Sequence, residues 1–160
     1  MSVSRGGVPK TPLPECLVGP LGLQGDVHAH PNVHGGPLKA VLVICMETLD
    51  ELRAAGFPVY AGALGENLTV QGIDRRQMRA GQRWRAGDAV IELTTLRVPC
   101  SSIRGYDLPG RPLRDQLHDA ACKAGNPESP VWARGGFYAS VVQSGTVRPG
   151  APFVLIEQRA

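Results

Sequence analysis

Cys100 is the residue whose type and position most clearly allow chemistry. It follows Pro99, directly after the strand-like run 89–98. Proline cannot donate to a sheet ladder, so the strand must stop there and the next side chain is presented at the rim of a sheet. A cysteine thiolate is both a nucleophile and a soft metal ligand, and nearby cations favour it. Arg97 and Arg104 flank Cys100, so the sequence predicts nucleophilic or metal chemistry at this position.

A second set of candidate ligands lies in the segment that follows residue 25. Asp26, His28, His30 and His34 offer one carboxylate and three imidazoles to a metal ion. Their spacing has no helical register and Pro31 interrupts it, so the pattern is weak as a zinc signature. We therefore expect that these histidines do not jointly hold zinc.

Two glycine-rich turns present further polar side chains. The turn 34–37, His-Gly-Gly-Pro, leads directly to Lys39, and such a turn can aim backbone N–H groups and a lysine at an anion. The loop 62–67 ends in Asn67, which suits either ligand binding or the capping of local backbone groups. Lys39, Asn67 and His34 are therefore candidate binding residues.

The elements that must position these residues are expected to be mainly strands with short connecting helices. With 160 residues and 42% hydrophobic content, the chain is sized for one domain with a real core. Its 20 glycines and 14 prolines put many turns into a short chain, which disfavours a helix bundle. The sequence predicts strands over 15–18, 39–45, 84–86, 89–98, 137–143 and 153–157, a helix that starts at a capping box at 48–51, and a helix over 112–123.

The charge pattern argues against some classes of function. Seventeen basic and 14 acidic residues give a net charge of +3, and no basic run exceeds two residues. Extended nucleic-acid binding is therefore not indicated, and a small anionic ligand fits this balance better. Residues 1–14 lack an apolar signal core, and no stretch approaches the roughly 20 apolar residues of a membrane span. We therefore expect a cytoplasmic protein that does not cross a membrane.

The cysteine spacing excludes the common dithiol motifs. Cys16, Cys45, Cys100 and Cys122 lie far apart and form no Cys-x-x-Cys pair. Neither a zinc ribbon nor a redox dithiol is supported by this spacing. Reduced thiols are the expected state in the cytoplasm.

In their order along the chain, several motifs resemble the MOSC domain family, which is named after the carboxy-terminal domain of molybdenum cofactor sulfurase. They are Leu21-Gly22-Leu23-Gln24-Gly25-Asp26, His34-Gly35-Gly36-Pro37 with Lys39-Ala40, Gly65-Glu66-Asn67-Leu68-Thr69-Val70, Gly87-Asp88 and Pro99-Cys100. The resemblance extends from residues 8–10 to 146–150. It implies a single MOSC domain over residues 1–160 with a loop-rich amino-terminal arm over about 1–14. It also implies a mainly β fold, a MOSC-type β-barrel with short flanking helices.

The same resemblance implies that the protein binds the molybdenum cofactor (molybdopterin), a molybdenum-bearing pyranopterin with a phosphate tail. Asn67 and Lys39 are then expected to contact the pterin or the phosphate, together with His34 on the adjoining turn. Arg97 and Arg134 are expected as further partners of the anion. Amide and guanidinium donors suit a hydrogen-bonding heterocycle that carries a phosphate.

Two uses of Cys100 follow from the resemblance, because the family's cysteine ligates molybdenum in reductase members and carries sulfur in an alternative role. In the first, the protein reduces N-hydroxylated small molecules with electrons from an external donor protein. In the second, Cys100 carries a persulfide supplied by a cysteine desulfurase, or the domain only binds and transfers the cofactor. The same residues serve all these uses, so the sequence leaves them open.

One position departs from the family pattern. Val98 stands two residues before Cys100, where some amidoxime-reducing relatives carry a hydroxyl residue, so one polar contact to the cofactor is expected to be missing. A plain β-barrel interaction domain with an inert Cys100 is the third reading, and the joint occurrence of the motifs favours it least.

Overall fold

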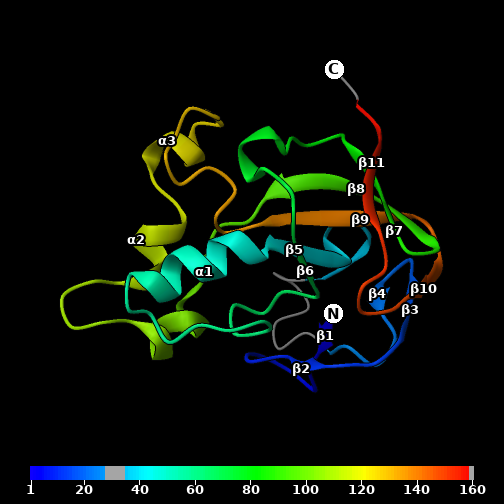
Figure 1. Cartoon of the computed structure of the whole chain (residues 1–160), viewed down its shortest axis with the longest axis horizontal. Coiled ribbons are helices and arrows are strands. Elements are labelled where there is room, and N and C mark those ends of the chain that lie inside the picture. Colours follow the sequence, from blue (N-terminus) through cyan, green and yellow to red (C-terminus); the bar gives the residue numbers. More distant parts are fainter. Residues whose placement is uncertain (28–34, 159–160) are drawn as a thin grey trace.

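The computed structural model describes residues 1–27 and 35–158, which form a curled, mainly β structure (Figure 1). The strands are β1 (Ser2–Val3), β2 (Thr11–Pro12), β3 (Cys16–Gly19), β4 (Gly22–Leu23), β5 (Val41–Cys45), β6 (Leu68–Val70), β7 (Arg83–Ala86), β8 (Ala89–Leu96), β9 (Phe137–Gln143), β10 (Gly145–Val147) and β11 (Phe153–Glu157). The α-helices are α1 (Met46–Ala54), α2 (Leu113–Leu117) and α3 (Ala120–Lys123). The predicted fold class, a β-barrel type with short flanking helices, is confirmed as a curled half-barrel.

Within the described residues, the largest sheet has six strands in the order β11-β7-β8-β9-β5-β6. A three-stranded sheet, β10-β3-β4, and a short pair, β1-β2, lie beside it. The β5–β6 pair is parallel, whereas the neighbouring β5–β9 pair is antiparallel. All five residues of β5 are buried, as expected for a strand with neighbours on both edges and packing on both faces.

The predicted strands are present with shifted ends. The hairpin β7–β8 turns at Gly87-Asp88 as predicted, and β8 ends at Leu96, two residues earlier than predicted. The strand predicted over 39–45 begins only at Val41, because the preceding residues Pro37–Lys39 form a 3-10 helix (η1). Proline in the first turn of η1 suits this conformation and delays the start of the sheet ladder.

Both predicted helices need correction. The helix α1 begins at Met46 rather than at the capping box, so Thr48 lies inside it and is buried. The segment 112–123 is not one helix, because His118 and Asp119 have extended backbone conformations between α2 and α3. The Asp119 carboxylate accepts the Cys122 backbone N–H at 2.7 Å and so starts a new helix, a local bond that competes with continuing the old one.

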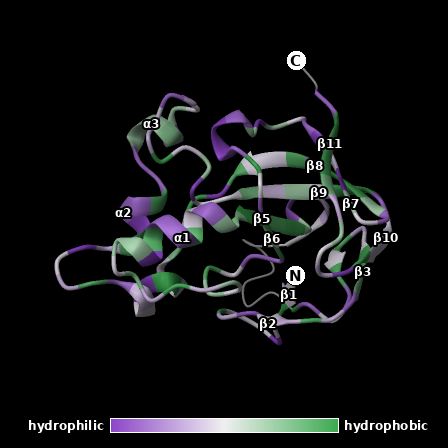
Figure 2. Cartoon of the chain, viewed as in Figure 1, coloured by the Kyte–Doolittle hydropathy of each residue, from purple (hydrophilic) through white to green (hydrophobic). Residues whose placement is uncertain are grey.

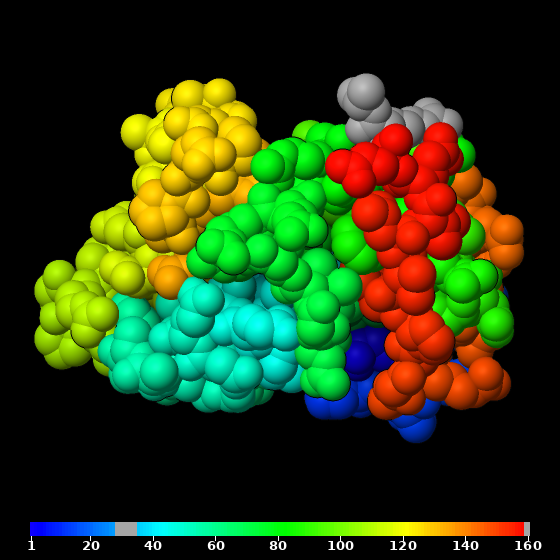
Figure 3. All heavy atoms as spheres, turned by 45° about the horizontal axis from the view of Figure 1, so that its top comes forward, coloured from blue at the N-terminus to red at the C-terminus, as the bar shows by residue number. Residues whose placement is uncertain are grey.

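The core has two parts. The larger lies between the sheets and contains residues such as Val43, Ile91 and Phe137, and the smaller packs α1 against α2 and the loop over 57–64. Figure 2 shows hydrophobic residues on the central strand β5 and hydrophilic residues on α2, while α3 and the loops are mixed. In the space-filling view, β11 lies on the surface beside the segment that contains β7 (Figure 3). No helix in the described ranges is long and apolar enough to span a membrane.

Candidate functional site

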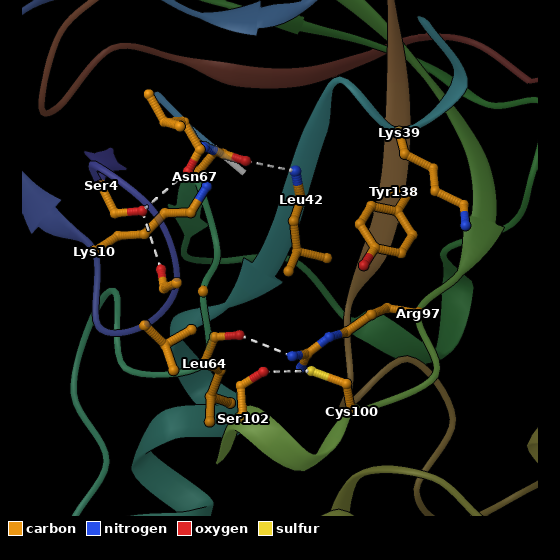
Figure 4. Close-up of a pocket in the computed structure, with 14 residues that line it drawn as sticks. Ser4, Lys10, Lys39, Leu42, Leu64, Asn67, Arg97, Cys100, Ser102 and Tyr138 are labelled. Atoms are coloured by element: carbon orange, nitrogen blue, oxygen red, sulfur yellow. Dashed lines mark hydrogen bonds between the residues drawn. The ribbon is translucent and has the colours of Figure 1, made fainter. Parts of the chain in front are cut away.

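A pocket of about 560 Å³, counting its open mouth, lies where the amino-terminal arm meets the ends of several strands (Figure 4). The lining residues are Ser4, Gly7, Val8, Lys10, Val27, Lys39, Leu42, Leu64, Gly65, Asn67, Arg97, Cys100, Ser102 and Tyr138. They include three cations, and no carboxylate is among the lining residues in the described ranges. The pocket therefore suits an anionic ligand.

Cys100 lies on the pocket wall, between the end of β8 and a 3-10 helix, Ser101–Tyr106 (η3). Its thiol is partly exposed, and its Sγ is 2.9 Å from the Ser102 hydroxyl. Burial alone raises the pKa of the Cys100 thiol, but the contacts with Ser102 and the Arg97 charge outweigh burial, and the net pKa is lowered. A lowered pKa increases the thiolate fraction, which is the form that binds metals and attacks electrophiles. The predicted placement of Cys100 at a sheet rim is consistent with this geometry.

Arg97 forms the floor of the pocket beside Cys100. Its side chain is only 3% exposed, and its Nη2 donates to the Leu64 carbonyl oxygen at 2.9 Å. The Nε and Nη1 atoms are also buried, and they have no hydrogen-bond partner among the described residues. A buried charged group with unsatisfied donors is costly, and in native proteins such donors are normally paired. The arrangement fits a bound group that carries acceptor atoms.

Lys10 reaches the pocket because the arm is bonded to the glycine loop. The Lys10 backbone N–H donates to the Gly62 carbonyl at 2.9 Å. Gly62 has φ of 93°, and a Cβ there would lie 2.3 Å from the Lys10 carbonyl oxygen, so only glycine permits this approach. The Lys10 ammonium pairs with the Asp26 carboxylate, and both side chains are nearly fully buried. Burial lowers the pKa of Lys10, although its hydrogen bond to Asp26 opposes this effect.

Asn67 lines the pocket, but its amide is largely occupied by protein partners. Its Oδ1 accepts the Leu42 backbone N–H at 3.0 Å, and its Nδ2 donates to Asp26 Oδ2 at 2.8 Å and to the Ser2 carbonyl at 3.3 Å. The residue therefore joins the arm, β5 and the glycine loop. The neighbouring Glu66 is fully buried and accepts the Gly62 and Leu64 backbone N–H groups, which holds the loop in shape.

Lys39 and Tyr138 form the side of the pocket opposite the arm. The Lys39 Nζ lies 5.4 Å from the centre of the Tyr138 ring, within the distance of a cation–π contact. Lys39 ends η1, and Tyr138 lies on β9, so this side is built by two elements that are far apart in sequence. Burial raises the pKa of Tyr138, although the nearby Arg97 charge opposes this effect.

The structure does not bring every predicted residue to this pocket. Arg134 is not among its lining residues, because its guanidinium pairs with Glu51 on α1 at 2.6 Å and points to the Gln116 carbonyl at 3.4 Å. The structure therefore does not bring Arg134 to this pocket, and its role as an anion partner stays a prediction. Val98 is 58% exposed and also does not line the pocket, so the missing hydroxyl removes no contact from it.

The histidine segment is only partly described. His28, His30 and His34 lie outside the described residues, so the role predicted for His34 and the expected lack of a shared zinc site stay predictions. In the described ranges, no group of three or more His, Cys, Asp or Glu residues is placed to hold a metal ion. Asp26, proposed as a candidate ligand alongside these histidines, uses its carboxylate for Lys10, Asn67 and the Ser4 backbone N–H.

Sequence reasoning missed Lys10, Ser102 and Tyr138 as pocket residues. Ser102 had a local signal, because a hydroxyl residue two positions after a candidate cysteine can reach its sulfur. No local signal in the sequence separates Lys10 and Tyr138 from the other lysines and tyrosines of the chain. Only the path of the arm and the pairing of β9 with β5 bring them to the site.

The sequence matches the family model described as MOSC domain over residues 30–154, which is most of the chain. The chain belongs to the MOSC domain family. Domains of this family are associated with molybdenum cofactor sulfurases. Four of the five motifs that resemble the family, those around Asp26, Lys39, Asn67 and Cys100, have residues that meet at or directly behind this pocket. The fifth, Gly87-Asp88, forms the turn between β7 and β8 and does not line the pocket.

Named relatives share this MOSC domain. The protein is 28% identical over 151 residues to YiiM from Escherichia coli (strain K12), an alignment that covers 90% of this chain and 60% of YiiM. It is 30% identical over 139 residues to the uncharacterized protein YflK from Bacillus subtilis (strain 168), covering 84% of this chain and 56% of YflK. The chain thus spans less than two thirds of the length of these relatives.

Solved structures agree with the fold. The crystal structure of YiiM from Geobacillus stearothermophilus is 29% identical, with a TM-score of 0.62 over 94% of this chain and 65% of that chain. The crystal structure of YiiM from Escherichia coli is 26% identical, with a TM-score of 0.60 over 91% of this chain and 64% of that chain. The MOSC half-barrel is therefore the common part of these molecules.

Proposed function

We propose that this protein binds the molybdenum cofactor in the pocket around Cys100. The observation that carries the proposal is the buried Arg97 guanidinium, two of whose nitrogens have no hydrogen-bond partner among the described residues. An oxygen-rich anionic group in the pocket would satisfy these donors and offset the burial of their charge. The family association with molybdenum cofactor sulfurases supports this choice of ligand over other small anions.

The residues present fit this cofactor in type. Lys10, Lys39 and Arg97 would hold its anionic and hydrogen-bonding groups, since all three line the pocket. Cys100 would hold the molybdenum, because thiolate is a soft ligand for such a metal. Asn67 would keep the arm, β5 and the glycine loop together around the cofactor, as its hydrogen bonds indicate.

The reaction we propose is the reduction of N-hydroxylated small molecules. When bound, the cofactor supplies two-electron chemistry at the substrate oxygen, and an external donor protein supplies the electrons. The chain contributes the thiolate ligand, the cations that orient the bound groups, and a wall with four aliphatic side chains, those of Val8, Val27, Leu42 and Leu64, that limits access of water.

A second candidate function is favoured by the partial exposure and lowered pKa of the Cys100 thiol. A cysteine desulfurase persulfide would transfer its sulfane sulfur to the Cys100 thiolate, which forms a new S–S bond and releases the desulfurase thiolate. Cys100 would then be a sulfur carrier. A module that binds and transfers the cofactor without reducing any substrate would use the same pocket.

Cofactor content tests binding directly. The protein is produced in a host that makes the molybdenum cofactor, and molybdenum and pterin per chain are measured after purification. We expect both in the wild type, reduced but matching amounts of both in Cys100→Ser, and neither in Arg97→Met. Cys122→Ser, which removes a buried cysteine that does not line this pocket, should behave as the wild type. A wild type that carries neither molybdenum nor pterin would contradict the proposal.

Activity separates the two uses of Cys100. Cofactor-loaded wild type and Cys100→Ser are given an N-hydroxylated substrate and a chemical electron donor, so that a missing partner protein cannot explain failure. Reduction by the wild type alone supports the reductase. Inactivity of the loaded wild type, together with transfer of a persulfide from a desulfurase, would favour the sulfur carrier.

A further inference from the structure

Ser102 is the side chain that contacts the sulfur of Cys100. Its hydroxyl lies 2.9 Å from Cys100 Sγ, and both residues line the pocket (Figure 4). Among the described residues, no other side chain forms a hydrogen bond with this sulfur. A thiolate has no proton to donate, so when Cys100 acts as a ligand or nucleophile the Ser102 hydroxyl must be the donor.

The backbone of Ser102 is held in place even though its side chain is exposed. Ser102 is in η3, and the next residue, Ile103, is 1% exposed in the smaller core. The end of η3 is closed by the Asp107 N–H, which donates to the Arg104 carbonyl at 3.0 Å. Because Ile103 anchors this turn, the Ser102 hydroxyl stays within reach of Cys100 Sγ.

The free Cys100 side chain would otherwise have a choice of rotamers. A partly exposed cysteine has a single side-chain torsion before its sulfur, and the three staggered positions are close in energy unless a contact selects one. The hydrogen bond to Ser102 selects one of these positions. In this rotamer, Sγ lies on the pocket wall. The same pocket is lined by Arg97, Lys39 and Tyr138, which are charged or titratable groups on neighbouring elements.

We propose that Ser102 is a positioning residue that fixes the Cys100 sulfur in the orientation facing the pocket. The inference deepens the proposed function, since a fixed sulfur is the ligand that a molybdenum centre would meet. Hydrogen bonds to sulfur ligands orient them and tune their bonding to metals, and loss of such partners typically costs about 10- to 100-fold in metal affinity or activity. The orientation itself requires no bound cofactor and can be measured in its absence.

The first test is made on the ligand-free chain of 160 residues. Three-bond Hα–Hβ couplings of Cys100, measured by NMR, report whether its χ1 torsion is fixed or averaged. We expect the couplings of a single staggered rotamer in the wild type, one large and one small or two small, and two intermediate couplings in Ser102→Ala. Ser102→Thr keeps the hydroxyl and should restore the wild-type couplings. Ser101→Ala, which removes the adjacent exposed hydroxyl, is the matched control and should change nothing.

Three results of this test would overturn the inference. Ser102→Ala could keep the wild-type couplings, or the wild type could itself show averaged couplings. A change of equal size in Ser101→Ala would also overturn it, because the effect would then belong to the turn and not to the hydroxyl. Amide spectra of each variant show whether the fold is retained.

A second test uses the cofactor-loaded protein and separates this inference from the proposed function. We expect loaded Ser102→Ala to lose molybdenum on dialysis about tenfold faster than the wild type, with rescue by Ser102→Thr. If the wild type carries no molybdenum, the proposed function fails while the couplings still decide the role of Ser102. If molybdenum is bound and Ser102→Ala retains it as firmly as the wild type, the positioning role at the metal is rejected.

Discussion

The Arg97 guanidinium donates from Nη2 to the Leu64 carbonyl oxygen at 2.9 Å, across 33 residues of sequence. This bond ties the end of β8 to the glycine loop and holds a buried cation at the floor of the pocket. The bond uses one nitrogen of the guanidinium, and Nε and Nη1 have no partner in the described ranges. Burying these two donors without partners lowers the stability of the ligand-free protein.

The first prediction follows from this position of Arg97. Arg97→Met keeps the length of the side chain and removes the buried charge, so the ligand-free protein should be unchanged or more stable by about 1 kcal/mol. Urea unfolding of the ligand-free variant measures this, and the cofactor content of the purified protein should fall to zero. Arg85→Met, at an exposed position on β7, is the control for loss of a charge. A clear loss of stability in Arg97→Met would show that the residue serves the fold.

The second prediction concerns the buried pair of Lys10 and Asp26. Asp26→Asn keeps the shape of the side chain but leaves the Lys10 ammonium without its counter-ion, which should destabilise the protein by about 3 kcal/mol. The matched control is Asp50→Asn. The side chains of the Asp50–Arg53 ion pair are 46–58% exposed, so the loss of this pair should lower the free energy of unfolding by less than about 0.5 kcal/mol. Equal effects of the two substitutions on the free energy of unfolding would contradict the structure.

The third prediction tests the contact between the arm and the glycine loop. Gly62→Ala places a Cβ 2.3 Å from the Lys10 carbonyl oxygen and strains a backbone with φ of 93°, so we expect a loss of about 2–4 kcal/mol. Gly72 has a similar φ of 76°, and a Cβ there would have no atom within 4 Å. Gly72→Ala should therefore lose only the free energy of backbone strain, about 1 kcal/mol. The difference between the two variants isolates the close approach of the arm, and its absence would mean that the arm does not pack there.

The fourth prediction is a dependence of stability on pH at His118. Burial lowers the pKa of His118 below its usual 6.5, with Arg114 and Lys123 acting in the same direction and Asp119 opposing them. Between this lowered pKa and about 6.5 the unfolded chain binds a proton that the folded chain does not, so stability falls as pH falls through this window. His118→Gln should lose less stability than the wild type over the same acid range, as measured by urea unfolding at several pH values. Parallel losses in both proteins would rule out this contribution.

Much of the framework was predictable because it depends on local patterns. Pro99 ends a strand wherever that strand lies in a sheet, and Gly87-Asp88 makes a tight turn between β7 and β8 through backbone preferences alone. The helix over 112–123 failed for an equally local reason, since the Asp119 carboxylate captured a backbone N–H and restarted the helix. That competition is decided by small energies that hydrophobic periodicity does not report.

The sequence by itself determined the family, the main strands and the chemical type of the site, because motif order and residue types are properties of the chain. The tertiary structure decided which side chains meet. It placed Arg97 and Lys10 in the pocket, turned Arg134 toward Glu51, and showed that the Asn67 amide is bonded to the arm and β5. These outcomes depend on loop paths between distant elements and on which donors find acceptors after folding, and neither can be read from spacing along the chain.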